Sequence, residues 1–191
     1  MSNVLASFLV SFGVIFVAEM GDKSQLMALA FATRYRTLPV LVGITIATAL
    51  VHLVSVIVGA ALGAAIPTRP ITFVAAVAFI VFGVWTLRGE KLTETDEQRA
   101  VGKARSTVLT VGVVFFLAEL GDKTMLATIT LATREGIVGT WLGSTVGMVA
   151  ADALAIVVGR ALGTRLPERG IRFGAAISFF VFAAILLFEA I

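Results

Sequence analysis

The sequence repeats itself at an offset of 100 residues, and its two halves align without a gap. The pattern Glu-x-Gly-Asp-Lys-(Ser/Thr) occurs at residues 19–24 and again at 119–124, and Ala-Thr-Arg occurs at 32–34 and at 132–134. Chance similarity between apolar helices would not align Glu, Asp, Lys and Gly at one offset. We therefore interpret the chain as two fused copies of one unit.

Each copy consists mainly of long apolar segments. Hydrophobic residues make up 59% of the 191 residues and charged residues 14%, whereas about a quarter of a soluble domain is charged. A helix needs about 20 apolar residues to span a bilayer. The predicted segments are Val4–Thr33, Leu38–Ile66, Ile71–Leu87, Thr107–Thr133, Ile137–Leu166 and Ile171–Ile191. The sequence thus predicts an all-α integral membrane protein with six transmembrane helices.

Three helices per copy is an odd number, so the second copy should be inverted relative to the first. If successive connections between the helices lie on alternate sides of the membrane, one side receives eleven of the fifteen basic residues and the other only Arg69 and Arg134. The remaining two are the lysines of the repeated motif. By the positive-inside rule the richer side is cytoplasmic. We expect two inverted three-helix repeats, at 1–87 and 106–191, joined by a cytoplasmic linker at 88–105, with both termini outside. The net charge of +3 then reflects topology and not a nucleic-acid partner.

The two repeated motifs place four carboxylates within apolar sequence. They are Glu19, Asp22, Glu119 and Asp122. A charged side chain at mid-bilayer costs at least about 2.5 kcal/mol and indicates function by default. On one helix, the Glu and Asp of a motif would share a face, because they are three residues apart. Gly21 and Gly121 are natural places for a helix break. We expect the inverted motifs to meet near the membrane midplane, as in transporters built from inverted repeats.

The oxygen atoms of the motifs form a hard ligand environment. It suits Ca²⁺, Mg²⁺ or Mn²⁺ rather than thiophilic metals. Auxiliary ligands would be Ser24, Thr124 and Gln25. The structural alternative is that the glutamate of each motif pairs with the lysine four residues later, Lys23 or Lys123, which leaves both aspartates without named partners. The two interpretations coexist if each lysine acts as a built-in cation when the site is empty.

His52 and Asp152 occupy equivalent positions in the two repeats, on polar stripes of the second segments. They could support the cation ligands or belong to a proton path. The alternative is a buried hydrogen bond that fixes helix packing. The series Gly139, Gly143 and Gly147 should allow close helix contact.

The doubled motif in a six-helix, two-repeat chain resembles the GDT family of cation/proton exchangers, which transport manganese or calcium. The resemblance covers essentially the whole chain. It implies that the four motif acids bind the cation, with Ser24 and Thr124 as auxiliary oxygen ligands, and Lys23 and Lys123 match the family's basic position. The chain shows no N-terminal extension like that of the eukaryotic members, so we expect a multi-pass protein of the plasma (inner) membrane.

The favoured function is secondary transport, namely export of a divalent cation, first of all Mn²⁺, in exchange for protons through a midplane carboxylate site. Ca²⁺/proton exchange is the close alternative, because hard carboxylate ligands serve both ions. A basic amino-acid exporter is more distant. An intramembrane enzyme with paired carboxylates would lack a nucleophile or cofactor motif, and a structural scaffold would not need the acids. We expect no enzymatic activity, no tightly bound cofactor and no nucleic-acid partner; the partners are metal ions, protons and the bilayer, and homo-oligomerisation stays open.

Overall fold

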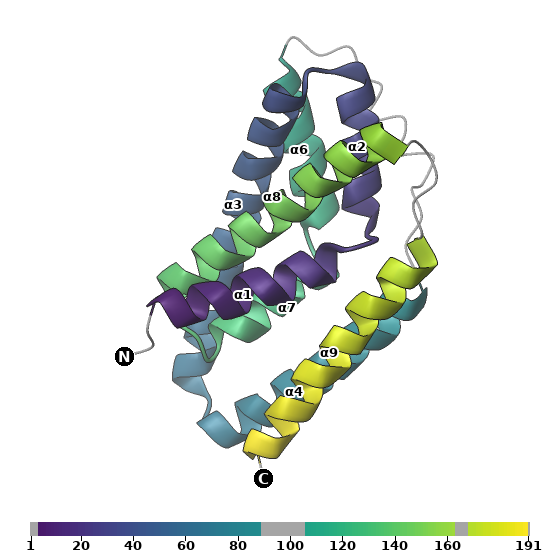
Figure 1. Cartoon of the computed structure of the whole chain (residues 1–191). Coiled ribbons are helices and arrows are strands. Elements are labelled where there is room, and N and C mark those ends of the chain that lie inside the picture. The colour runs from purple at the N-terminus through teal and green to yellow at the C-terminus, as the bar shows by residue number, and fades with distance from the viewer. Residues whose placement is uncertain (1–3, 89–105, 163–167, 191) are drawn as a thin grey trace.

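The structure is a computed structural model that describes residues 4–88, 106–162 and 168–190 (Figure 1). Within these ranges every regular element is an α-helix and no strand occurs. The helices are α1 Val4–Glu19, α2 Lys23–Arg34, α3 Thr37–Ala65, α4 Thr68–Arg88, α6 Thr107–Glu119, α7 Lys123–Ala132, α8 Ile137–Leu162 and α9 Glu168–Ala190. The predicted linker at 88–105 lies, apart from Arg88, outside the described residues.

Three helices are long and apolar enough to cross a membrane, namely Thr37–Ala65, Arg69–Arg88 and Ile137–Arg160. The bent pair α1 and α2 would add a fourth span if it counts as one. Thr107–Glu119 and Phe173–Phe188 are shorter apolar helices. The prediction of a helical membrane protein is confirmed for the described ranges, while the number of six spans and their inversion stay predictions.

Each acidic motif breaks its apolar segment into two helices. Gly21 has φ 75° and Gly121 has φ 79°, a left-handed conformation that costs other residues about 1–2 kcal/mol. The helix before each glycine ends at the motif glutamate, and the next begins at the motif lysine, with the chain bent by 75° between α1 and α2. The predicted breaks are confirmed. The expectation that Glu and Asp of one motif share a helix face is wrong, because the aspartate caps the following helix.

Each repeat packs mainly against the other. The main contacts of α1 are with α8, the equivalent helix α6 lies along α3, and α4 pairs with α9 (Figure 1). Glycines of α8 permit the first of these contacts, as predicted. A Cβ atom at Gly147 would lie 2.7 Å from the carbonyl oxygen of Phe12, and Cβ atoms at Gly139 and Gly143 would lie even closer to the backbone of α1. Small residues thus let the two backbones approach.

Two clusters of buried apolar side chains lie beside the helix breaks. The first joins α2, α3 and α6 and includes Phe31, Ile44 and Phe115. The second joins α1, α7 and α8 to the α4–α9 pair, where the rings of Phe79 and Phe179 have centroids 5.9 Å apart. The clusters fix the positions of the four helix ends that meet at the acidic motifs.

Candidate metal-ion site

The two broken segments bring their acidic motifs together. Carboxylate oxygens of Glu19, Asp22 and Glu119 lie within 4.8 Å of one another. All three side chains are buried, with at most 1% of their surface exposed. Glu19 and Glu119 are the last residues of α1 and α6, and Asp22 caps the start of α2 through the backbone nitrogen of Ser24. Residues about 100 positions apart in the sequence therefore form one acidic cluster.

Each motif lysine pairs with the aspartate of the other motif. The Nζ atom of Lys23 lies 3.0 Å from Oδ1 of Asp122, and the Nζ atom of Lys123 contacts Oδ1 of Asp22. The side chains of the second pair are 3% and 0% exposed, whereas that of Lys23 is 23% exposed. The sequence predicted neither of these pairs. The helix break moves each lysine onto a new helix and directs it across the interface between the repeats.

Several carboxylate oxygens of the cluster accept no hydrogen bond from the described residues. They are both oxygens of Glu19, Oε1 of Glu119 and Oδ2 of Asp122. The alternative pairing of Glu19 with Lys23 is therefore not supported by a hydrogen bond. Buried polar groups normally have partners, and an unpaired buried carboxylate is strongly unfavourable. Two oxygens on opposite sides of a Ca²⁺ ion would lie about 5 Å apart, so the observed spacing fits a cation between them.

The hydroxyl groups after the aspartates contact the acids directly. Oγ1 of Thr124 donates a hydrogen bond to Oε2 of Glu119 at 2.9 Å, and Oγ of Ser24 lies 3.3 Å from Oδ2 of Asp22. Both hydroxyls are buried. The structure thus places the two predicted auxiliary residues at the cluster, where they orient one acid of each motif.

Gln25, the third predicted auxiliary residue, lies at the first helix break. Its Oε1 atom accepts a hydrogen bond from the backbone nitrogen of Gly21 at 2.8 Å, and its Nε2 atom donates to the carbonyl of Ala151 at 3.0 Å. The side chain therefore ties the helix break to α8, and a positioning role fits it better than metal ligation. In the second repeat Met125 replaces it, and its sulfur lies 3.2 Å from the backbone nitrogen of Gly121.

Asp152 is a further buried acid in the neighbourhood of the cluster. It is fully buried, and neither carboxylate oxygen has a hydrogen-bond partner among the described residues. It interacts electrostatically with Asp22 and with both motif glutamates. His52, its counterpart in α3, is 1% exposed, and its Nδ1 atom also lacks a partner in the described ranges. The alternative of a packing hydrogen bond is therefore not met through Nδ1, and the role of His52 stays a prediction.

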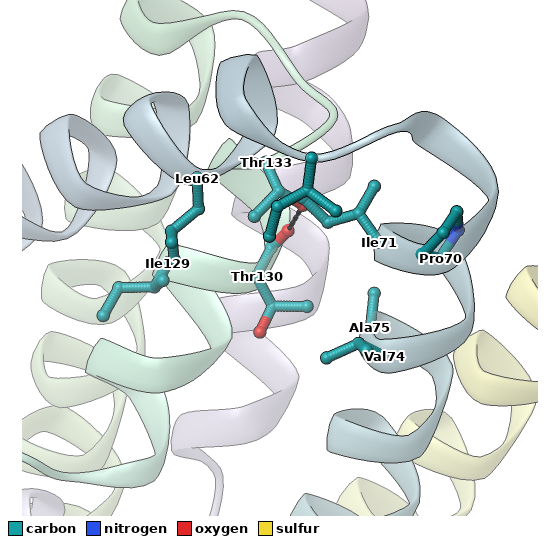
Figure 2. Close-up of a pocket in the computed structure, with 9 residues that line it drawn as sticks. Leu62, Pro70, Ile71, Val74, Ala75, Ile129, Thr130 and Thr133 are labelled. Atoms are coloured by element: carbon teal, nitrogen blue, oxygen red, sulfur yellow. Dashed lines mark hydrogen bonds between the residues drawn. The ribbon is translucent and has the colours of Figure 1, made fainter.

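An apolar hollow of about 220 Å³ lies at a different place, between the end of α3, the start of α4 and α7 (Figure 2). Leu62, Ile71 and Ile129 are among its lining residues, none of which is charged. The hydroxyl of Thr133 donates to the carbonyl of Thr130 at 2.7 Å, so this polar group is satisfied. The hollow suits hydrocarbon and does not extend the acidic cluster.

Buried acids at paired helix breaks, within a bundle of apolar helices, define a class of protein: membrane transporters that bind cations at the depth of the bilayer. Residues 7–94 and 107–191 match the family described as divalent cation/proton antiporter GDT1. The chain belongs to this family. Its members are transporters and not enzymes, and the family implies no cofactor.

Curated relatives cover most of the chain. It is 29% identical over 168 residues to a protein of Vibrio cholerae named "Putative manganese exporter", which covers 86% of this chain and 82% of that protein. Protein PAM71 of Arabidopsis thaliana is 30% identical over 218 residues, across 100% of this chain and 59% of its own length. The divalent cation/proton antiporter GDT1 of Saccharomyces cerevisiae is 26% identical over 240 residues, across 99% of this chain and 86% of that protein. No solved structure matches the chain.

Proposed function

We propose that this protein exports Mn²⁺ in exchange for protons. The observation that carries the proposal is the cluster of Glu19, Asp22 and Glu119, whose carboxylate oxygens lie within 4.8 Å of one another in a buried position. Oxygen ligands of this kind suit hard divalent cations. The name of the Vibrio cholerae relative supports manganese as the ion.

Asp122 completes the proposed ligand set, because its Oδ2 atom is buried without a hydrogen-bond partner in the described chain. Ser24 and Thr124 then act as auxiliary oxygens, and Gln25 positions the first helix break. Lys23 and Lys123 neutralise the two aspartates in the ion-free state. An arriving cation takes over this neutralisation, so the lysines move off the aspartates as the ion binds.

The arrangement of helices supports two inverted repeats, 1–87 and 106–191, that form six spans. The exchange of partners, in which α1 lies along α8 and α6 along α3, is the pattern expected of two units related by a two-fold axis. With the basic residues on the cytoplasmic side, the α7–α8 connection faces the outside of the plasma membrane, as do both termini. Alternating access then follows from one repeat rocking against the other.

Coupling to protons supplies the energy for export. Moving two positive charges outward against an inside-negative potential costs about 4.6 kcal/mol per 100 mV, since each elementary charge costs about 2.3 kcal/mol. Two protons moving inward for each ion would balance this charge. The carboxylates that release the cation are the groups that accept the protons.

Reconstituted vesicles test this proposal and separate manganese from calcium. Purified protein in liposomes with an imposed pH gradient should move Mn²⁺ faster than Ca²⁺ and carry protons in the opposite direction. Asp22→Asn should reduce the rate at least about 100-fold, while Asp96→Asn, in the linker outside the apolar segments, should not change it. Faster movement of Ca²⁺ would assign the protein to Ca²⁺/proton exchange. Movement of neither ion would refute the proposal.

A further inference from the structure

Buried hydroxyl groups lie along α1, α7 and α8 between the acidic cluster and the turn that joins α7 to α8. They lie where α1, α7 and α8 meet, and all of them are 0% exposed. They are Ser7, Ser11, Thr124, Thr128, Thr140 and Ser144. Apart from Thr124, these residues lie outside the acidic motifs.

The two ends of this group are defined by hydrogen bonds. At the outer end, Oγ of Ser7 donates to Oε2 of Glu135 at 2.9 Å, in the turn between α7 and α8. At the inner end, Oγ1 of Thr124 donates to Glu119 at 2.9 Å. One helical turn further out, the hydroxyl of Thr128 donates to the carbonyl of Thr124 at 2.8 Å.

The middle of the group lies between these ends. Ser11 follows Ser7 by one helical turn on the buried face of α1, and the backbone on either side of it lies against Gly143 of α8. Thr140 and Ser144 flank this glycine and are also buried. The same three helices also meet at the apolar cluster that includes Val14, Leu131 and Met148.

Two hydroxyls in the middle have no partner among the described residues. Oγ of Ser11 and Oγ1 of Thr140 are buried and form no hydrogen bond with the described residues. Buried hydroxyls without a protein partner are commonly bonded to internal water. In a membrane-spanning region such groups mark places where single water molecules enter the bundle.

The equivalent positions in the other half of the molecule are apolar. Ser11, Thr128, Thr140 and Ser144 correspond at the offset of 100 to residues that are fully buried in one apolar cluster. These are Val111, Ala28, Val40 and Ile44. Only the counterparts of Ser7 and Thr124 keep a hydroxyl, and they are Thr107 and Ser24. The structure is therefore hydroxyl-lined on one side of the acidic cluster and sealed by hydrocarbon on the other.

We propose that the hydroxyl file from Glu135 to Glu119 is the path by which protons reach the acidic cluster from outside. The proposal rests on the proposed cation/proton exchange. A hydroxyl or water molecule accepts a hydrogen bond on one side and donates on the other, so a proton can pass along the file with no net change in any group. The cation takes another route, because it needs six or more oxygen ligands at once, and a Cβ atom at Gly147 would already collide with α1.

The counterpart residues provide the test. The double variant Ser11→Val/Thr140→Val installs residues that the fold already holds at the equivalent positions, and Ser11→Thr/Thr140→Ser keeps both hydroxyls. In proteoliposomes with a trapped pH-sensitive dye, we expect Mn²⁺-driven proton movement to fall at least tenfold in the valine variant and to stay within twofold in the hydroxyl-retaining variant. Equilibrium binding of Mn²⁺ to the purified protein should stay within twofold in both.

A lipid-facing substitution serves as the matched control. Thr45→Val makes the same chemical change on the exposed side of α3, where the hydroxyl donates to the carbonyl of Leu41 at 2.7 Å, and should leave exchange unchanged. Unaltered proton movement in Ser11→Val/Thr140→Val would refute the path. A loss of Mn²⁺ binding as large as the loss of proton movement would also refute it, because it would show that the two hydroxyls have a structural role. If the unaltered protein exchanges neither Mn²⁺ nor Ca²⁺ for protons, the proposed function itself fails and the path falls with it.

Discussion

The crossed ion pairs predict that the two motif lysines affect cation affinity to very different extents. Lys123 and Asp22 have side chains that are 3% and 0% exposed, whereas water reaches Lys23, which is 23% exposed in its pair with Asp122. Removing one partner of a buried ion pair costs about 3–5 kcal/mol. In the other pair only the lysine is open to water, because the side chain of Asp122 is 1% exposed, and we expect its worth to lie near that of an exposed pair, about 0.2–1 kcal/mol.

These energies convert directly into binding constants. A divalent cation supplies the positive charge that Lys123→Gln removes, so the loss of stability falls on the ion-free state. At about 1.4 kcal/mol for each factor of ten, a 3 kcal/mol loss tightens Mn²⁺ binding about 100-fold. Lys23→Gln should tighten it only about 1.4-fold to fivefold on the same scale.

Calorimetric titration of the purified protein with Mn²⁺ measures both constants, and thermal unfolding provides an independent readout. The midpoint of the ion-free Lys123→Gln variant should fall by about 6–20 °C, at about 2–4 °C per kcal/mol for a chain of this size, and saturating Mn²⁺ should restore most of it. Lys103→Gln, in the linker, is the control and should change neither quantity. Equal or weaker Mn²⁺ binding in Lys123→Gln, or a larger effect in Lys23→Gln, would refute the reasoning.

Two further predictions concern the helix contacts. Gly143→Val should destabilise the protein by about 1–3 kcal/mol through overpacking, because a Cβ atom there would meet the carbonyl of Phe8 and lie 3.0 Å from the nitrogen of Phe12. Size-exclusion chromatography of the solubilised protein should show a loss of folded material. An unchanged elution profile would contradict the described helix packing. Gly13→Ala is its control, since nothing lies within 4 Å of a Cβ at that position. Gln25→Met copies the second repeat and should lower stability by about 0.5–1.5 kcal/mol for one lost hydrogen bond, with Mn²⁺ affinity within twofold; a loss of more than tenfold would show that Gln25 is a ligand.

Much of the fold follows from short-range features of the sequence. Apolar length predicts helices in a membrane, and the glycines within the acidic motifs predict the breaks, because left-handed backbone favours this residue. The bend itself could not be anticipated in detail. At the first break Gln25 bonds to the carbonyl of Ala151, 126 residues away in the sequence, and short-range features do not predict this contact.

The candidate site was predictable in its composition but not in its pairing. The charge and depth of Glu19 and Asp22 predict a buried acidic cluster from the sequence alone. Spacing along one helix predicts a Glu–Lys pair in each motif, but that argument assumes an unbroken helix. Once the helix breaks, Lys23 starts a new helix, and its partner is decided by how the two repeats dock.

The exchange of lysines between the repeats also bears on how the protein is made. Lys123 follows Asp22 by 101 residues, so the first half of the chain leaves the ribosome long before its buried acid can be neutralised. An unpaired charge is unfavourable in hydrocarbon, so we expect the first half to reach its final place in the bilayer only when the second half supplies the lysine. Assembly of the bundle is then a late step that needs both halves.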